Sequence, residues 1–315
     1  MMRPSQLSKF VGPLLSLALL MACSSRGADT TNVSQKPRPA GGSRNITNLY
    51  YVPNGTDRQN LDIYLPATGS NFPVVIWVHG GGWTSNSKEH PGGFSFVRDG
   101  YALVSINYRQ SQHAKWPAQI VDCKSAIRWL RAHAAEYSLD AGHIGVWGLS
   151  SGGHMVAMLG VTGDTREFDQ GDNLSYSSAV QVVGDWFGPT DFLSVSNEPG
   201  HMRWGGNGDV DTSLLGGKPS ENIEKAKSAS PAHFVSKNSA PFIIMHGAKD
   251  LTVPVQQSDE LVALLKKAGV PVEYYVVPNG GHGQPKAEFE GPVPLARLHA
   301  FFDKYLKPGK AAGAK

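Results

Sequence analysis

Short, almost uninterrupted apolar runs alternate with amphipathic stretches along the chain, and this alternation constrains the fold more than any other feature. Six runs have the length of a single strand: 74–78, 102–106, 144–147, 180–183, 242–245 and 272–277. Runs without polar alternation are typical of strands covered on both faces, as in a parallel sheet. Two runs upstream of them, 46–52 and 61–65, indicate an opening hairpin.

Helical patterns occupy the gaps between these runs. They cover residues 118–134, 256–267 and 292–305, where apolar residues recur with helical spacing. Strand–helix alternation throughout residues 45–308 predicts one doubly wound α/β domain, with a mostly parallel sheet flanked by helices. The stretch 191–225 is rich in Gly, Asn and Asp and predicts an insertion, forming a small cap at the carboxyl edge of the sheet. Ligands bind at that edge in open α/β sheets.

Composition excludes several classes of function. The net charge of +3 comes with no dense Lys/Arg block, which argues against a nucleic-acid partner. The sequence has two cysteines, no H-E-x-x-H pattern and no clustered Cys/His spacing, so neither a disulfide framework nor a metal site is expected. No dinucleotide fingerprint or phosphate loop appears either, and we therefore expect no cofactor.

The N-terminus predicts export and anchoring to a membrane. Residues 1–22 combine a basic start with a short apolar run, and they end directly before Cys23. This resembles a bacterial lipoprotein signal, which implies acylation of Cys23 and a place in the outer membrane, the periplasm or at the cell surface. Residues 23–44 are small and polar, as expected of a flexible tether, and a polar tail at 309–315 closes the chain.

A candidate nucleophile lies between a strand pattern and a helix pattern. Residues 148–152 read Gly-Leu-Ser-Ser-Gly, which matches G-x-S-x-G and follows the apolar run 143–147. The helix-like stretch 153–160 comes next. Strand, sharp turn and helix are the context of a nucleophile elbow, whose strained serine requires small neighbours. The sequence therefore predicts Ser150 as a nucleophile.

A glycine-rich loop precedes this elbow in the chain. Residues 79–83 read His-Gly-Gly-Gly-Trp and directly follow an apolar run. Glycines at such a place allow backbone N–H groups to approach a developing oxyanion. We expect Gly81, Gly82 and Ser151 to donate these N–H groups, and His79 to hold the loop by hydrogen bonding.

A serine nucleophile needs a base, and the base needs an orienting carboxylate. In this kind of fold the chain order is serine, acid, histidine. His282 lies in a Gly-rich loop after the last strand pattern, and Asp250 lies in the loop after the strand before it. Asp191 also follows a strand pattern and is the rival acid. Strand order favours Asp250.

With these motifs in order, the sequence resembles an α/β-hydrolase of the bacterial ferulic-acid-esterase-like group, related to the HGGG carboxylesterases and the kynurenine formamidases. The resemblance spans residues 48–306, and its supporting segments are 61–66, 79–83, 107–109, 117–122, 148–154, 230–231 and 246–254. It implies a serine carboxylesterase with a Ser-His-Asp triad. Ser151 departs from the pattern, since relatives often carry alanine there.

Substrate identity is less constrained by the sequence. Export and family analogy favour short-acyl esters or the acetyl and feruloyl esters of polysaccharides. Trp83 and Trp186 follow strand ends on the predicted active face, and we expect them to line the substrate pocket. An amidase, formamidase or peptidase with the same triad is one alternative. A non-catalytic envelope-binding lipoprotein is another, and the oligomeric state stays open.

Overall fold

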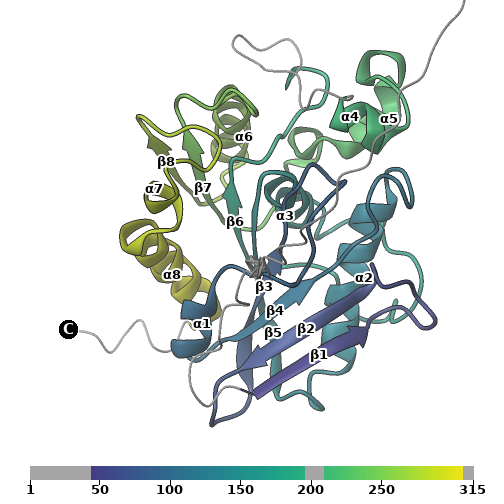
Figure 1. The fold of residues 1–315 in the computed structure, drawn as a ribbon, viewed down its shortest axis with the longest axis vertical. Coiled ribbons are helices and arrows are strands. Elements are labelled where there is room, and N and C mark those ends of the chain that lie inside the picture. The colour runs from purple at the N-terminus through teal and green to yellow at the C-terminus, as the bar shows by residue number, and fades with distance from the viewer. Residues whose placement is uncertain (1–43, 196–208, 308–315) are drawn as a thin grey trace, which may run out of the picture. The chain divides into compact units, whose positions relative to one another are not determined.

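A computed structural model describes residues 44–195 and 209–307, all within one compact unit built on an eight-stranded sheet (Figure 1). The strand order is β1-β2-β4-β3-β5-β6-β7-β8. β2 pairs antiparallel with β1 and β4, and the other pairs are parallel. The strands are β1 Arg44–Tyr50, β2 Asn60–Leu65, β3 Phe72–Val78, β4 Ala102–Ile106, β5 Leu139–Leu149, β6 Val182–Trp186, β7 Phe242–Gly247 and β8 Val272–Val277.

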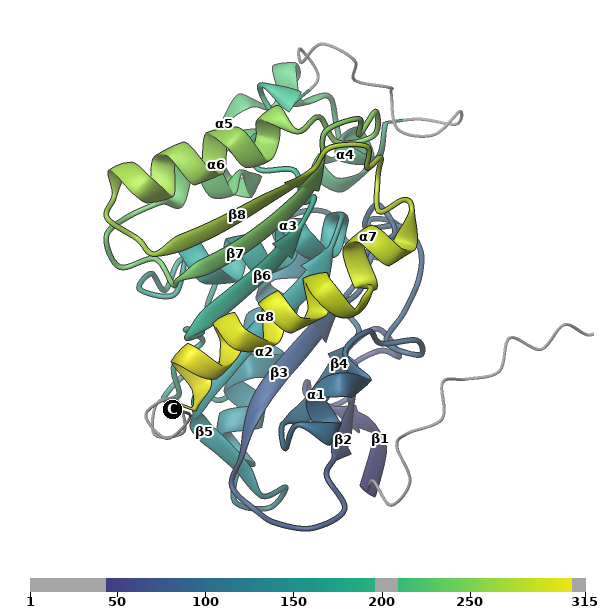
Figure 2. The same cartoon turned by 90° about the vertical axis from the view of Figure 1, so that its left-hand side faces the viewer.

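Helices cover both faces of this sheet, as the two views show (Figures 1 and 2). The larger helices are α2 Ala118–Ala132, α3 Ser151–Val161, α6 Gln256–Lys267 and α8 Pro292–Leu306. The shorter ones are α1 Phe94–Arg98, α4 Val210–Leu215, α5 Ile223–Ala229 and α7 Lys286–Glu290, with 3₁₀ turns η2 Pro219–Glu221 and η3 Pro231–Phe234. The sequence predicted the larger helices to within a few residues, and it predicted none of the short ones.

The sheet separates two hydrophobic cores. Successive strand side chains alternate between faces, so Ile76 contributes to the core under α2, α3 and α6, while Trp77 contributes to the core under α1 and α8. The second core is strongly aromatic and includes an edge-on pair of Trp77 and Trp147, whose ring centroids lie 4.7 Å apart. Because both faces are covered, the central strands read as continuous apolar runs in the sequence.

Several boundaries differ from the sequence predictions. β6 begins at Val182 and runs to Trp186, so the predicted run 180–183 ended too early. α3 begins at Ser151, directly after the elbow, rather than at residue 153. Arg44, expected in the tether, is the first residue of β1. The predicted insertion contributes α4, η2 and α5, while residues 196–208 within it lie outside the described part.

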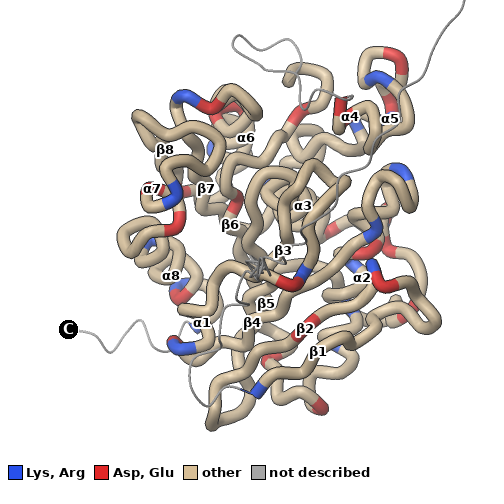
Figure 3. Tube along the Cα trace, in the orientation of Figure 1, with Lys and Arg blue, Asp and Glu red and all other residues tan. Residues whose placement is uncertain are grey.

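The predicted signal peptide (1–22), the lipidation site Cys23, the rest of the tether and the tail 309–315 also lie outside the described residues. Within 44–195 and 209–307, no helix has both the length and the apolar character needed to span a bilayer. The charged residues of this part are scattered over helices and loops, with both signs intermixed (Figure 3).

Candidate active site

Ser150 lies at a sharp turn between β5 and α3. Its backbone adopts φ 56° and ψ −123°, a region that non-glycine residues rarely occupy. Its N–H donates to the carbonyl oxygen of Trp186 at 2.9 Å, which ties the turn to the end of β6. A Cβ at Gly152 would collide with the backbone oxygen of Val78, so only glycine fits this position. The structure thus has the strained serine and the small neighbour expected of a nucleophile elbow.

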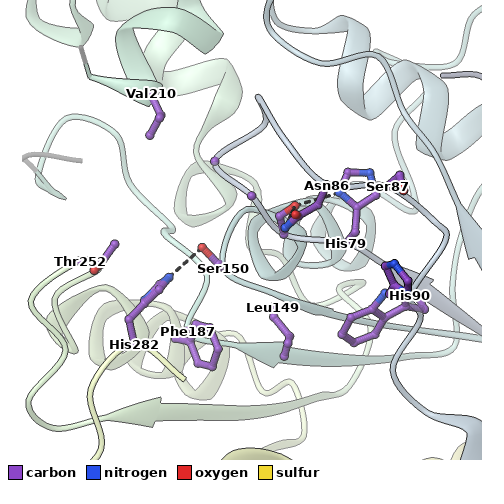
Figure 4. Close-up of a pocket in the computed structure, with 14 residues that line it drawn as sticks. His79, Asn86, Ser87, His90, Leu149, Ser150, Phe187, Val210, Thr252 and His282 are labelled. Carbon is purple, nitrogen blue, oxygen red and sulfur yellow. Dashed lines mark hydrogen bonds between the residues drawn. The ribbon is translucent and has the colours of Figure 1, made fainter. Parts of the chain in front are cut away.

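The loops after β7 and β8 bring Asp250 and His282 to this turn. His282 Nε2 lies 2.9 Å from Ser150 Oγ (Figure 4). On the other side of the ring, His282 Nδ1 lies 2.7 Å from Asp250 Oδ2. The carboxylate only accepts, so Nδ1 carries the proton and Nε2 is free to accept the serine hydroxyl proton. Ser150, His282 and Asp250 therefore form a continuous hydrogen-bonded chain with the geometry of a catalytic triad.

Asp250 is held as a carboxylate by its surroundings. Oδ1 accepts the N–H groups of Thr252 at 2.8 Å and Val253 at 2.9 Å. Burial raises the pKa of this carboxyl, but hydrogen bonds from His246 and His282 outweigh it and hold the pKa well below its usual range. Asp250 is thus ionised over the whole pH range in which a histidine base works.

His246 is a contact of this carboxylate that the sequence reasoning missed. Its Nε2 lies 3.3 Å from Asp250 Oδ2 and 2.8 Å from the carbonyl oxygen of Val253, and its Nδ1 lies 2.6 Å from Ser258 Oγ. An Nε2–H shared by two acceptors, with Nδ1 accepting from the serine, satisfies every one of these contacts. His246 and His282 therefore both contact Oδ2 of Asp250, and His246 helps to hold the carboxylate in place. The available signal was its position four residues before Asp250, at the end of a strand.

The rival acid lies elsewhere. Asp191 accepts the N–H of Leu193 at 2.8 Å, and its nearest histidine partner is His233 at 4.0 Å. Asp250, and not Asp191, contacts His282 in the structure, as strand order indicated.

The glycine-rich loop after β3 packs directly against the elbow. A Cβ at Gly80 would lie 3.5 Å from Ser150 Cβ, so the backbone at this point borders the nucleophile. Gly81 and Gly82 have φ of 110° and 58°, which glycine adopts without strain. Among the described residues their N–H groups donate to no acceptor. Ser151 is the first residue of α3, where an N–H has no partner within the helix.

Two buried histidines brace this loop. His79 stacks on Tyr108 with ring centroids 4.4 Å apart, and Tyr108 donates its hydroxyl to the His79 carbonyl oxygen at 3.0 Å. Trp83 Nε1 donates to His154 Nδ1 at 3.2 Å, and His154 Nε2 lies 2.7 Å from the carbonyl oxygen of Ala229. The second chain ties the loop to α3 and to the end of α5. The predicted role of His79 in holding the loop agrees with these contacts.

Burial lowers the pKa of both histidines, His79 to about 4 and His154 to about 4. In the unfolded chain both have ordinary values near pH 6.5. The unfolded state therefore binds more protons between about pH 6.5 and pH 4, and the free energy of unfolding must fall as the pH drops through this window. Above it, the contribution of the neutral rings is fully present.

We expect the free energy of unfolding to be higher at pH 7 than at pH 4.5, by on the order of a few kcal/mol. The urea midpoint at pH 7 is then higher as well. Urea titrations at several pH values measure it. The His154→Gln variant removes one titrating group, so its midpoint is lower at pH 7 but depends less steeply on pH. A variant with the same pH slope as the wild type would contradict this origin of the acid sensitivity.

A pocket of about 650 Å³ opens over Ser150. Figure 4 shows His282 and Thr252 on one side of Ser150, with Leu149 and His90 on the other. The remaining lining residues are Trp77, the loop residues 79–82, Asn86, Ser87, Phe187 and Val210. No Lys, Arg, Asp or Glu is among the described residues that line it. Most of the exposed surface of these described lining residues is apolar, and none of them carries a fixed charge.

The expectation that Trp83 and Trp186 line this pocket is wrong. Both side chains are fully buried. Trp83 packs beside His154 on the α3 side, and Trp186 donates its Nε1–H to the carbonyl oxygen of Phe289 at 3.0 Å. Trp77 and Phe187 supply the aromatic surface instead. Within the described ranges, no group of three or more His, Cys, Asp or Glu side chains could hold a metal ion.

The comparison with known protein families decides the family. The family model described as BD-FAE matches residues 61–265, which is more than half of the chain. The chain belongs to this family. The predicted resemblance is confirmed at the level of family and of the α/β-hydrolase fold, while the lipoprotein signal stays a prediction.

Relatives of known structure and sequence agree with this family. A structure titled "Truncated form of carbohydrate esterase from gut microbiota" is 34% identical, with a TM-score of 0.78 over 85% of this chain and 99% of that one. An acetyl ester-xyloside bifunctional hydrolase from Caldicellulosiruptor lactoaceticus is 25% identical, with a TM-score of 0.61 over 79% and 84%. Esterase LipQ of Mycobacterium tuberculosis is 34% identical over 75% of this chain. The chain spans 52–60% of the length of LipQ and two further curated relatives.

Proposed function

We propose that this BD-FAE family protein is a serine carboxylesterase. The observation that carries the proposal is the hydrogen-bonded chain from Ser150 through His282 to Asp250, beside a pocket lined by the glycine-rich loop 79–82. The names of the relatives, a carbohydrate esterase and Esterase LipQ, support it.

The geometry supports a two-step mechanism. His282 Nε2 takes the Ser150 hydroxyl proton as Oγ attacks the ester carbonyl, and the N–H groups of Gly81, Gly82 and Ser151 stabilise the oxyanion that forms. His282 then gives its proton to the leaving alcohol. In the second step water attacks the acyl-enzyme with His282 as base. Asp250 keeps the imidazole in the required tautomer and stabilises the imidazolium.

The position of His282 indicates which side of the pocket takes the leaving alcohol and which takes the acyl group. The leaving alcohol receives a proton from His282, so it departs on the side of His282 and Thr252. The acyl group then extends toward Leu149 and His90 (Figure 4). The described lining is uncharged and mostly apolar, which favours neutral acyl groups, such as acetyl, short acyl or feruloyl groups. Two solved relatives, one named a carbohydrate esterase and the other an acetyl ester-xyloside bifunctional hydrolase, support polysaccharide side groups as the source of these esters.

A panel of neutral esters tests this proposal. We expect hydrolysis of aryl acetate, aryl butyrate, methyl ferulate and acetylated xylan, with little turnover of esters whose acyl group carries a carboxylate. Matched ester and anilide substrates with the same acyl group measure the preference for esters over amides. Faster cleavage of the anilide would favour an amidase over an esterase. No turnover of the ester or of the anilide would contradict both functions.

A further inference from the structure

Arg58 contacts the histidine of the glycine-rich loop from outside the pocket. It lies between β1 and β2 and is not among the residues that line the pocket. Its Nη2 is 3.3 Å from His79 Nε2 and 3.0 Å from the carbonyl oxygen of Asn86, and its Nε is 3.4 Å from the carbonyl oxygen of Tyr108. The guanidinium therefore connects His79 with the backbone of Asn86 and of Tyr108.

This contact determines the tautomer of His79. A guanidinium can only donate, so His79 Nε2 must be the acceptor and the neutral ring carries its proton on Nδ1. Nδ1 lies 2.8 Å from the carbonyl oxygen of Gly80, to which it then donates. The opposite tautomer would place the Nδ1 lone pair against that oxygen and an N–H against the arginine. The ring also stays neutral, because burial lowers its pKa and the charge of Arg58 lowers it further.

The Gly80 carbonyl in turn sets the direction of the Gly81 N–H, because both belong to one peptide group. Asn86 Nδ2 donates to the same oxygen at 3.4 Å, so the carbonyl is held from two sides. A trans peptide is planar, and its N–H points opposite to its carbonyl. With the Gly80 oxygen held by His79 and Asn86, the Gly81 N–H must point away from them. The close approach of Gly80 to Ser150 places this peptide beside the reacting centre.

We propose that Arg58 is a positioning residue for oxyanion stabilisation, which selects the His79 tautomer that anchors the Gly80 carbonyl and so aims the Gly81 N–H. This inference rests on the proposed esterase function for its kinetic effect. The chain Arg58–His79–Gly80–Gly81 acts on transition-state charge, so it acts on kcat and leaves substrate binding almost unchanged.

Side-chain ¹⁵N NMR of the histidines tests the first link without any substrate. In the wild-type protein we expect His79 as a neutral ring protonated at Nδ1 at pH 7, and the His79→Asn variant assigns the signal. In Arg58→Met we expect a mixture of tautomers with proton density on Nε2. A wild-type ring protonated at Nε2, or an unchanged Nδ1–H ring in Arg58→Met, would overturn the proposal. A failure of the esterase assay would leave this readout intact.

Kinetics test the second link. Arg58→Met is expected to lower kcat for an aryl acetate by about tenfold to a hundredfold, while KM stays within about twofold. This loss of kcat is no larger than the loss expected on removing one oxyanion donor. Arg58→Lys keeps a cationic donor and should recover part of the loss. Arg98→Met removes an exposed arginine of α1 and serves as the matched control.

A double-mutant cycle separates this role from a general structural one. In a His79→Asn background, whose amide donor does not depend on a tautomer, Arg58→Met should cause little further loss of kcat. Losses that simply add would overturn the proposal, as would an Arg58→Met enzyme with wild-type kcat. A boronate that mimics the tetrahedral intermediate should lose affinity in Arg58→Met in parallel with kcat.

Discussion

Replacing Ser150 with alanine is expected to lower kcat/KM for a short-acyl aryl ester by roughly 10⁵- to 10⁶-fold. The substitution removes the atom that lies 2.9 Å from His282 Nε2 and would form the acyl-enzyme. Residual activity over water would come from the pocket and the oxyanion donors alone. Initial rates at several enzyme concentrations measure the loss, and circular dichroism verifies folding.

The neighbouring serine provides a matched control for this variant. Ser151→Ala removes a hydroxyl of the same kind one residue away, while the backbone N–H assigned to the oxyanion site is unchanged. We expect its kcat/KM to stay within about threefold of the wild type, because the buried Ser151 hydroxyl has no assigned role in the reaction. If Ser150→Ala and Ser151→Ala lost activity equally, the assignment of the nucleophile would be wrong.

Replacing Asp250 with asparagine should lower kcat by about 10⁴-fold. The amide leaves the shape of the site almost intact, but it removes the charge that stabilises the imidazolium and the acceptor that fixes the His282 tautomer. Substrate binding involves neither effect, so KM should change little. Steady-state kinetics from pH 6 to pH 9 measure both constants.

Asp191→Asn is the matched control, because Asp191 was the rival acid in the sequence and its carboxylate contacts Leu193 and His233 rather than His282. It should retain kcat near that of the wild type. A large loss in Asp191→Asn together with an active Asp250→Asn would reverse the assignment of the acid.

The chemistry of this site could be predicted from the sequence because it depends on chain order. The elbow needs a strand, a small-residue turn and a helix, and residues 143–160 show all three. Asp250 and His282 follow the last two strands of a parallel sheet, and the carboxyl ends of parallel strands share one edge. These strands could be predicted from the sequence because each appears as a continuous apolar run.

The pocket wall could not be predicted in this way, because side-chain direction at a strand end depends on backbone angles. Trp186 is the last residue of β6 and points into the core, while Phe187 has φ 45° and lines the pocket. Trp83 has φ 57° and is turned inward. No periodicity in the sequence encodes such positive φ values at non-glycine residues.

Contacts between segments that lie far apart in the chain could also not be predicted from the sequence. Arg58 meets His79 across 21 positions of the chain, and Val210 of the insertion reaches the pocket from α4. Such pairs arise from tertiary packing, which a single sequence does not reveal. The short helices α4 and α5 span six and seven residues, which is too short to show a clear helical repeat of apolar residues in the sequence.

Covalent labelling by a fluorophosphonate, followed by mass spectrometry of the intact protein and its peptides, tests the central claim most directly. The account predicts one adduct per chain, located on Ser150, with labelling slowed strongly in Asp250→Asn and absent in Ser150→Ala. An unlabelled wild-type protein, or an adduct on any other residue, would contradict it.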